Sequence, residues 1–281
     1  VVSETSPPWT HELILGVEHE IDRAFALGAN FVYREHGDFT WAPRAGEDDP
    51  GFWEPVVQNV PGYGELNVYQ PTGPRALNTV YKQRANYDET HAGLELFLRK
   101  RFTNGWMANA SFNFGQTVEN YRGAGSYTDP TNLSSRDGRP RYQGNRFAAW
   151  GASRWEFKLS GMTQLPAGFS VAGYLQAREG AINTQSVLSN NRAFGAGRVD
   201  ALVEPFGATR LPVFWSLDLR AEKVFDVSAA GRIHLILDAF NVTNNDTILG
   251  QEGRLNSRLY GRITDVLQGR TIRLGMRLVL R

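Results

Sequence analysis

Residue types that carry catalysis or bind metals occur in this sequence without the spacing that either chemistry needs. No Gly-x-Ser-x-Gly segment and no phosphate-binding loop is present, and no nucleophile stands near a base. His11, His19 and His91 are dispersed, and a lone histidine in a strand is more often structural than a metal ligand. The acidic segment at 46–50 suggests calcium only weakly, because exposed acidic turns are far more common. We therefore expect no enzyme, no metal site and no cofactor.

The composition excludes several classes of protein. The 281 residues include 30 basic and 29 acidic side chains, so the net charge is +1, and no basic stripe for nucleic acid is visible. Cysteine is absent, which rules out disulfides and thiolate metal sites. No apolar run reaches the ~18 residues of a membrane helix. The mean hydropathy of −0.38 still permits a membrane barrel, because the strands of a barrel are only half apolar.

The final stretch, Thr271–Arg281, has a pattern that recurs along the chain. Its side chains alternate strictly between two faces, which predicts a strand with one apolar and one polar side. A strand that crosses a bilayer needs roughly 9–11 residues, whereas strands of soluble sheets usually have about 5–6. The length therefore favours a membrane strand. Its apolar face would carry Ile272, Leu274, Met276, Leu278 and Leu280.

Eight earlier segments repeat this two-sided pattern: Trp9–Ile21, Phe25–Tyr33, Glu89–Phe102, Trp106–Phe114, Arg154–Leu165, Phe169–Arg178, Trp215–Phe225 and Arg232–Thr243. Tight turns, such as Thr103-Asn-Gly105, alternate with long polar stretches at 34–88, 119–152, 179–212 and 244–268. Within the first long stretch, short β-like pieces are expected at Glu65–Gln70 and Thr79–Arg84. The whole pattern predicts an all-β, antiparallel up-and-down transmembrane β-barrel with short periplasmic turns and long extracellular loops.

A soluble β-sandwich also alternates, but three features favour the membrane barrel. Most of the expected strands have roughly 10–14 residues, enough to cross the apolar band of an outer membrane. Four tryptophans lie near strand ends, as in the aromatic girdles of membrane proteins: Trp9, Trp106, Trp155 and Trp215. The polar faces carry full charges that suit a water-filled lumen. The residues expected to face the lumen are Glu18, Glu95, Arg99, Arg154, Glu156, Asp218, Arg220, Asp238, Arg273 and Arg277.

Two lysines, Lys100 and Lys223, fall in the outward register of their strands. Both lie close to an expected periplasmic turn, where a lysine can extend its ammonium to the membrane surface at little cost. They are therefore compatible with a lipid-facing surface.

The C-terminal part of the chain resembles the barrel of TonB-dependent outer-membrane transporters. The resemblance rests on residues 214–244, which end in Asp238-Ala-Phe-Asn-Val-Thr-Asn244, and on residues 261–278, which include the arginine-containing last strand. Within that family the chain is most similar to the Oar-like subgroup, whose plug follows a carboxypeptidase-regulatory-like domain. Arg139-Pro-Arg141 and the turn Leu165-Pro-Ala-Gly-Phe169 carry this finer similarity.

Two features depart from that family. Its barrels end in an aromatic residue, whereas this chain ends in Leu280-Arg281. Its barrels have about 22 strands and a plug, whereas about nine strands are expected here, an odd number that would leave open edges in lipid. Residues 1–281 are therefore expected to form a single partial barrel domain, with the plug and the N-terminal strands in a missing N-terminal portion. The missing initiator methionine and signal peptide agree with a processed piece or a fragment.

The resemblance implies a receptor and transporter in the outer membrane of a Gram-negative-type bacterium. Such a protein would bind a scarce nutrient (a metal chelate, a glycan or a peptide) through its long loops. It would import the nutrient with energy from a TonB-type coupling protein that acts on the absent plug. The candidate ligand contacts are Tyr63, Tyr69, Tyr121, Arg122, Tyr127, Arg136 and Arg141.

The partners that the resemblance implies are outer-membrane lipid, the missing barrel and plug portion, the TonB-type protein and a small-molecule or peptide substrate, with no nucleic acid. Two alternatives stay open at this point. One is a structural scaffold barrel within a larger envelope assembly. The other is a soluble β-rich binding module.

Overall fold

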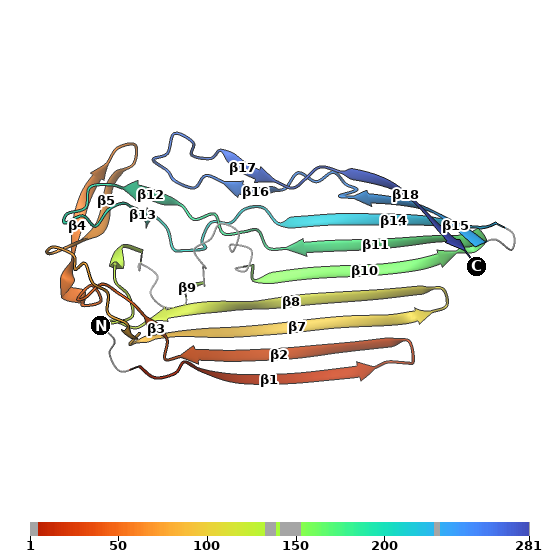
Figure 1. Ribbon diagram of the computed structural model, residues 1–281, viewed down its shortest axis with the longest axis horizontal. Helices are drawn as coiled ribbons and strands as arrows, with labels where there is room; N and C mark the ends of the chain where they lie inside the picture. Colours follow the sequence, from red (N-terminus) through yellow and green to blue (C-terminus); the bar gives the residue numbers. More distant parts are fainter. Residues whose placement is uncertain (1–4, 133–138, 141–152, 228–230, 281) are drawn as a thin grey trace.

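The protein folds as one long-stranded, twisted wall of β-structure with its long loops gathered at one end (Figure 1). The structure is a computed structural model and describes residues 5–132, 139–140, 153–227 and 231–280. Nine long strands follow one another in the sheet in the order in which they occur in the chain. They are β1 (Trp9–Glu20), β2 (Phe25–Gly37), β7 (Tyr87–Thr103), β8 (Trp106–Tyr121), β10 (Trp155–Leu165), β11 (Phe169–Arg178), β14 (Phe214–Val227), β15 (Gly231–Phe240) and β18 (Thr271–Leu280).

Each long strand pairs antiparallel with the next one, so the expected all-β up-and-down topology is confirmed. The strands contain between 10 and 17 residues, well above the ~5–6 residues usual in soluble sheets. Among the described residues, no helix has the length and apolarity needed to cross a membrane.

The register of the sheet keeps side chains of one kind on one face across many strands. Leu15 pairs with Phe31, Phe31 with Leu94, Leu94 with Phe114, and Phe114 with Trp155. Because successive residues of a strand point to opposite faces, a slip of one residue in any pairing would break this row. We call the side that carries this row the apolar face.

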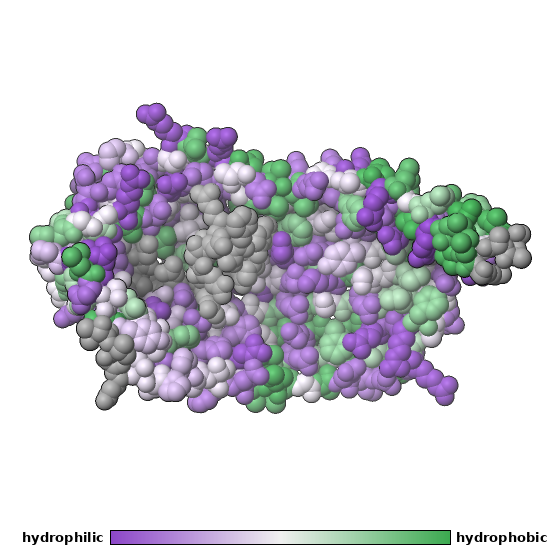
Figure 2. Space-filling view, viewed as in Figure 1, coloured by the Kyte–Doolittle hydropathy of each residue, from purple (hydrophilic) through white to green (hydrophobic). Residues whose placement is uncertain are grey.

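The opposite side of the sheet carries a matching polar row. Asn30 pairs with Glu95, Glu95 with Asn113, Asn113 with Glu156, and Glu156 with Arg178. We call this side the polar face. Figure 2 shows hydrophilic side chains spread over the strands on the side of the molecule in view. The two-sidedness that the sequence predicts for single strands therefore holds across the sheet.

The sheet does not bury its apolar face within the chain. Leu274 is 80% exposed and Met276 is 73% exposed, although both belong to a ten-residue strand. A soluble protein rarely leaves so large an apolar surface uncovered. This face therefore suits contact with lipid and not with water.

The buried hydrophobic core lies instead among the loops. Val60, Leu66, Val68, Val187 and Ala201 form a cluster in which every member is at least nine-tenths buried. These residues come from the connections between β2 and β7 and between β11 and β14. The connections thus fold as a packed unit at the loop end of the sheet.

The long connections contain more short strands than the sequence predicted. The first connection contains β3 (Thr40–Trp41), β4 (Trp53–Val60), β5 (Gly64–Pro71) and β6 (Lys82–Gln83). β5 covers the expected piece at Glu65–Gln70, and β6 covers two residues of the expected piece at Thr79–Arg84. The later connections contain β9 (Arg139–Pro140), β12 (Ser186–Ser189), β13 (Val199–Leu202), β16 (Ile248–Gln251) and β17 (Ile263–Val266), none of which was expected. β9 has two residues and pairs with β8, and the other four strands have four residues each, which is too few to show a clear alternation.

Several strand ends also differ from the expectation. β2 continues to Gly37 and β8 continues to Tyr121, where loops were predicted. The extensions pair His36 with Glu89 and Tyr121 with Tyr87, beyond the apolar band, where the alternation of polarity no longer marks a strand. β15 ends at Phe240 because Asn241 adopts a left-handed backbone with φ of 48°.

The tight turns follow the sequence closely. Asn104 and Gly105 both have positive φ, 53° and 78°, as a two-residue hairpin turn requires. The connection at 228–230 lies outside the described residues, but Val227 and Gly231 pair directly on either side of it.

We predict that Gly28 is required by the ring of Phe97, its partner on the polar face. A Cβ at Gly28 would lie 2.3 Å from Phe97 Cζ and 2.9 Å from the Val17 carbonyl oxygen. Gly28→Ala should therefore lower the free energy of unfolding by about 1–3 kcal/mol, measured by urea unfolding of the full chain in detergent micelles.

Gly275→Ala is the matched control, because the nearest atom to its Cβ would be Ile236 Cβ at an ordinary 3.7 Å. It should be neutral or slightly stabilising. In a Phe97→Ala background the cost of Gly28→Ala should shrink. Equal losses at Gly28 and Gly275 would contradict the steric explanation.

Candidate functional site

The polar face of the last three strands is a network of matched charges. Asp238 lies between two arginines and accepts hydrogen bonds from Arg220 Nε at 2.6 Å and from Arg273 Nη2 at 2.7 Å. One step toward the turn end, the Glu222 carboxylate contacts His234 Nδ1 at 2.5 Å and accepts from Arg277 Nη2 at 3.3 Å. Each carboxylate is thus shared by side chains from neighbouring strands, which locks the register through charge.

The polar face of the first strands carries a second network. Arg34 forms an ion pair with Glu12 across β1 and β2, and His91 Nδ1 contacts Thr117 Oγ1 at 2.9 Å across β7 and β8. Arg34 and His91 are themselves direct partners in the register. These side chains stand at the loop-side half of the sheet.

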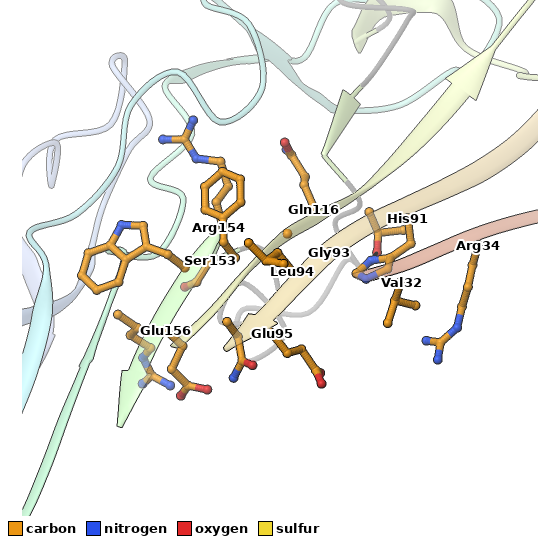
Figure 3. A pocket seen from close by; sticks show the side chains of 16 residues that line it. Val32, Arg34, His91, Gly93, Leu94, Glu95, Gln116, Ser153, Arg154 and Glu156 are labelled. Carbon is orange, nitrogen blue, oxygen red and sulfur yellow. Dashed lines mark hydrogen bonds between the residues drawn. The ribbon is translucent and has the colours of Figure 1, made fainter. Parts of the chain in front are cut away.

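A cavity of about 350 Å³ opens beside this second network (Figure 3). Its polar lining includes Arg34, His91, Glu95, Asn113, Glu156 and Arg178. The carboxyl groups of Glu95 and Glu156 point the same way from the sheet, toward the side on which Arg34 lies. Charges of both signs therefore meet around one opening.

The structure locates all ten residues that were expected to face a lumen. Nine of them lie on the polar face within the strands: Glu18, Glu95, Arg99, Glu156, Asp218, Arg220, Asp238, Arg273 and Arg277. The tenth, Arg154, directly precedes β10 and binds Glu179 at the loop end.

Three of the four predicted girdle tryptophans, Trp9, Trp155 and Trp215, lie at the loop end of their strands, and Trp106 lies at the turn end. On β8, Trp106 and Phe114 mark the two ends of an apolar span of nine residues, which contains eight residue-to-residue steps. At ~3.3 Å per residue this span measures about 26 Å along the strand, or about 20 Å along the normal of a membrane at a strand tilt near 40°.

The loops are held together by one buried arginine. The side chain of Arg192 is only 4% exposed and forms an ion pair with Asp129. It also donates to the carbonyl oxygens of Tyr69 at 3.2 Å, Ala196 at 3.0 Å and Gly197 at 3.2 Å. A single guanidinium thereby ties three separate connections of the sheet to one another.

Other contacts extend this loop assembly, by which we mean the described parts of the connections at 38–86, 122–154, 179–213 and 241–270. Gln58 Nε2 donates to the Asn191 carbonyl oxygen at 2.7 Å. The amide group of Asn256 pairs with the backbone of Leu188 in both directions, at 3.0 Å and 2.9 Å. All four connections therefore form one packed body above the sheet.

A stack of aromatic rings fills the base of the loop assembly. The guanidinium of Arg84 lies 3.5 Å from the ring centroid of Tyr87 and 5.3 Å from that of Tyr121. The Tyr87 hydroxyl contacts the carboxylates of Glu89 and Glu119 at 2.7 Å and 2.9 Å. The rings of Tyr87 and Tyr121 therefore pack within the protein, and the Tyr87 hydroxyl forms its hydrogen bonds there.

The predicted ligand contacts divide into accessible and packed residues. Tyr63 is 42% exposed at the turn between β4 and β5, and the Arg122 side chain is 59% exposed while it pairs with Asp88. Tyr69 is half-buried, Tyr121 is 9% exposed, and Tyr127 packs against the Tyr87–Tyr121 pair. Arg136 and Arg141 lie outside the described residues.

Glu179 joins two strands to the loop assembly and was not singled out from the sequence. Its carboxylate accepts from the Arg154 backbone N–H at 2.8 Å and from Arg154 Nε at 2.9 Å, and it lies 3.2 Å from Arg210 Nη1. The tight turn between β10 and β11 places positions 154 and 179 roughly opposite each other, so the register could have revealed this pair. Arg192 had no such signal, because Tyr69 and Asp129, the partners that connect it to other loops, are far away in the sequence.

The pKa of Glu179 reflects these partners. Burial alone would raise it, but the hydrogen bonds from Arg154 and the charge of Arg210 outweigh burial and hold the pKa of Glu179 below its ordinary value of 4.5. The carboxylate is therefore ionised at neutral pH and stabilises the junction.

No group of three or more metal-ligating side chains could hold a metal ion in the part of the chain that the structure describes. The polar face and the loop assembly present mixed charges and exposed aromatic or arginine side chains.

The fold matches outer-membrane transporters of known structure. The outer membrane transporter YddB from Escherichia coli has 14% sequence identity to the chain and a TM-score of 0.52, and the match covers 96% of this chain and 32% of that one. The FrpB iron transporter from Neisseria meningitidis has 12% identity and a TM-score of 0.53, with 98% and 32% covered.

A third match is P. aeruginosa FpvA bound to an iron complex of a heterologous pyoverdine, with 10% identity, a TM-score of 0.52, and 98% and 27% covered. The chain thus spans about a third of the length of these structures. No protein-family model and no curated protein sequence matches the chain. At these identities the similarity establishes a shared fold, that of the barrel wall of outer-membrane transporters.

The junction at Glu179 predicts a pH-dependent stability. A carboxyl whose pKa is lowered by folding adds stability above its unfolded pKa, and this stability is lost as the pH falls through the folded pKa. Glu179→Gln should therefore lower the free energy of unfolding by about 1–3 kcal/mol at neutral pH, because Arg210 keeps a poorly compensated charge. The gap between variant and wild type should close below pH 4.5, measured by urea unfolding across this range.

Glu65→Gln is the control. Glu65 is exposed on β5, and the substitution removes the same charge from the loop assembly. It should change the stability little at any pH. A loss at Glu179 that persists unchanged in acid would show that shape, and not charge, matters at this position.

The role of Arg192 predicts a local effect on the loops. Arg192→Lys keeps the charge but cannot reach four acceptors in a planar fork. Backbone amides at 193–203 should then exchange hydrogen at least tenfold faster, while those of β7 and β8 should be unaffected, as measured by hydrogen–deuterium exchange. Arg198→Lys, at an exposed position in the same segment, should leave exchange unchanged, and an equal effect of both changes would refute the role of Arg192.

Proposed function

We propose that this chain is the barrel portion of an outer-membrane receptor and transporter of the TonB-dependent kind, which binds a scarce nutrient and imports it. One observation carries the proposal: the separation of an apolar and a charged face that the register maintains across nine strands. A membrane-spanning sheet needs such a separation because one side meets lipid and the other meets water. The shared fold with outer-membrane transporters supports the same conclusion.

Under this proposal the polar face lines the lumen and the loop assembly faces the cell exterior. The four tryptophans Trp9, Trp106, Trp155 and Trp215 then form the girdles at the two surfaces of an outer membrane of Gram-negative type. The paired charges around Asp238 and Glu222 give the lumen wall alternating signs and little net charge. Such a wall offers hydrogen bonds to a polar solute without trapping it by charge.

We infer that further strands complete the barrel. Within the described residues, β1 and β18 each pair along one side only. An unpaired edge in lipid would leave a row of backbone groups without hydrogen bonds, which costs several kcal/mol per group. Residues 1–281 would then be one partial domain of a barrel of about 22 strands, with the plug and N-terminal strands in a missing N-terminal portion. A TonB-type protein would act on that plug.

The finer similarity of Arg139-Pro-Arg141 and of the turn at 165–169 favours the Oar-like subgroup. The substrate would be a metal chelate, a glycan or a peptide, bound by the loop assembly. Among the proposed contacts, Tyr63 and Arg122 keep the most accessible surface, and Tyr69, Tyr121 and Tyr127 would support them from below. Arg136 and Arg141 remain proposed contacts from the sequence. We propose no catalytic role.

Uptake by living cells tests this function. Cells that carry the gene should deplete at least one metal chelate, glycan or peptide from the medium, and cells with an in-frame deletion should not. The depletion should stop when an uncoupler collapses the proton gradient, because import needs energy from the inner membrane. Mass spectrometry of the medium measures both. An envelope defect without any change of uptake would instead favour the scaffold.

Variants in the loop assembly then test the proposed contacts. Tyr63→Ala and Arg122→Ala should each lower the affinity for the imported solute by about tenfold, measured by titration of binding to cells. Arg23→Ala is the matched control, because Arg23 is exposed near the opposite end of the sheet. It removes the same charge and should leave binding unchanged. Equal effects of Arg23→Ala and Arg122→Ala would contradict a specific contact.

A further inference from the structure

A groove of about 580 Å³ lies on the apolar face, near the turn end of β11, β14, β15 and β18. The side chains from the apolar face that line it are Phe169, Ala221, Lys223, Leu235, Leu237, Leu274 and Met276. Two rows of the register build it: Phe169, Lys223, Leu235 and Met276 in one, and Ala221, Leu237 and Leu274 in the next. The methyl group of Ala221 is short compared with its neighbours and leaves the space that forms the floor.

The one charged side chain of the groove from the apolar face is Lys223, which stands at its edge. Its ammonium donates to the carbonyl oxygen of Ala167 in the β10–β11 turn. It lies 4.4 Å from the ring centroid of Phe169 and 5.2 Å from that of Phe225. An ammonium has three N–H donors, and within the described residues this carbonyl oxygen is its only hydrogen-bond acceptor. Lys223 therefore has donors to spare for a ligand.

Lys100 occupies the equivalent place in the β7–β8 hairpin and shows the contrast. Its ammonium lies 2.9–3.1 Å from four acceptors, which are the carbonyl oxygens of Arg101, Thr103 and Trp106 and the hydroxyl of Thr103, so all three of its N–H groups are engaged. The residue is only 3% exposed. The N–H groups of Lys100 are thus all bound within its own hairpin. Lys223, beside the β10–β11 turn, differs in having N–H groups that remain available for a ligand.

Figure 2 shows hydrophobic side chains gathered at the right-hand end of the molecule, where β15 and β18 lie in Figure 1. The groove extends from Leu274 and Met276 of β18 to Lys223, whose ammonium lies near the rings of Phe169 and Phe225. An elongated apolar ligand that ends in an anion would match the groove, because its apolar part would lie on the apolar side chains and its anion beside the ammonium. The volume of the groove falls within the ~300–1,000 Å³ of sites that hold small molecules.

We propose that this groove binds one acyl chain of a phospholipid from the leaflet at the turn end, with its phosphate accepting a hydrogen bond from Lys223. The proposal rests on the proposed function, because it requires the apolar face to lie in a bilayer. The lysine and the rings of Phe169 and Phe225 stand at the level of the headgroups, where cations and aromatic side chains are favoured. The lipid binds through both its chain and its charge.

Native mass spectrometry of the full chain in detergent micelles tests the site. The probes are phosphatidylglycerol and, in a separate arm, a diacylglycerol with the same chains and no phosphate. The chain should retain one phosphatidylglycerol about fivefold more often than the diacylglycerol, as expected for one lysine near an anionic headgroup. Lys223→Gln should remove this preference and Lys223→Arg should keep it. Ala221→Phe should reduce the retention of both lipids because it fills the floor.

Lys158→Gln is the control, since it removes one lysine charge from the polar face. Retention of phosphatidylglycerol by Lys223→Gln or by Ala221→Phe at the wild-type level would overturn the lipid site. Flotation of the wild type with phospholipid vesicles separates the two proposals. If the chain floats and the variants behave like the wild type, only the lipid site fails. If the complete barrel, with the further strands that close it, does not float, the proposed membrane function fails as well.

Discussion

The structure depends on one constraint: the backbone N–H and C=O groups of the long strands pair sideways while each side chain keeps its face. A strand cannot satisfy its own backbone, and lipid offers no hydrogen bonds, so a sheet in a membrane must pair strand to strand over its full height. Antiparallel pairing from β1 to β18 achieves this along the sheet. Because the side-chain period is two, the same pairing decides which residues lie on the apolar face and which lie on the polar face.

This constraint moves the hydrophobic core out of the sheet. The strands place their apolar side chains on one uncovered face, as the 80% exposure of Leu274 shows, so under the proposed function the sheet gains its apolar stabilisation from lipid. The loops, which meet water, must bury apolar groups among themselves, and Val68 and Val187 are fully enclosed there. The protein therefore has two parts, a sheet with an uncovered apolar face and a loop assembly with a buried core. They meet at the loop end of the sheet, where Glu179 and its arginine partners connect strands to loops.

Charged side chains have different roles on the polar face, in the loop assembly and at the turns. On the polar face, Asp238 and Glu222 link three strands by short ion pairs that also hold the register. In the loop assembly, Arg192 uses its planar group to link three connections through the carbonyl oxygens of Tyr69, Ala196 and Gly197 and the carboxylate of Asp129. At the turns of the apolar face, Lys100 and Lys223 direct their ammonium groups to backbone carbonyls. Each charge lies where its surroundings offer an opposite charge or a carbonyl group.

The sequence by itself determined the two-sided strands, the alternation of tight turns and long connections, and the face of each charged strand residue. These features follow from the period of two and from turn residues such as Asn104 and Gly105, which act within a few positions of one another. Tertiary structure alone decided the extension of β8 to Tyr121, the hairpins within the loops and the packing of Tyr121 beneath them. It also decided the roles of Arg192 and the groove beside Lys223. The role of Arg192 depends on Tyr69 and Asp129, which lie far from it in the sequence, and the groove depends on the pairing of β11, β14, β15 and β18.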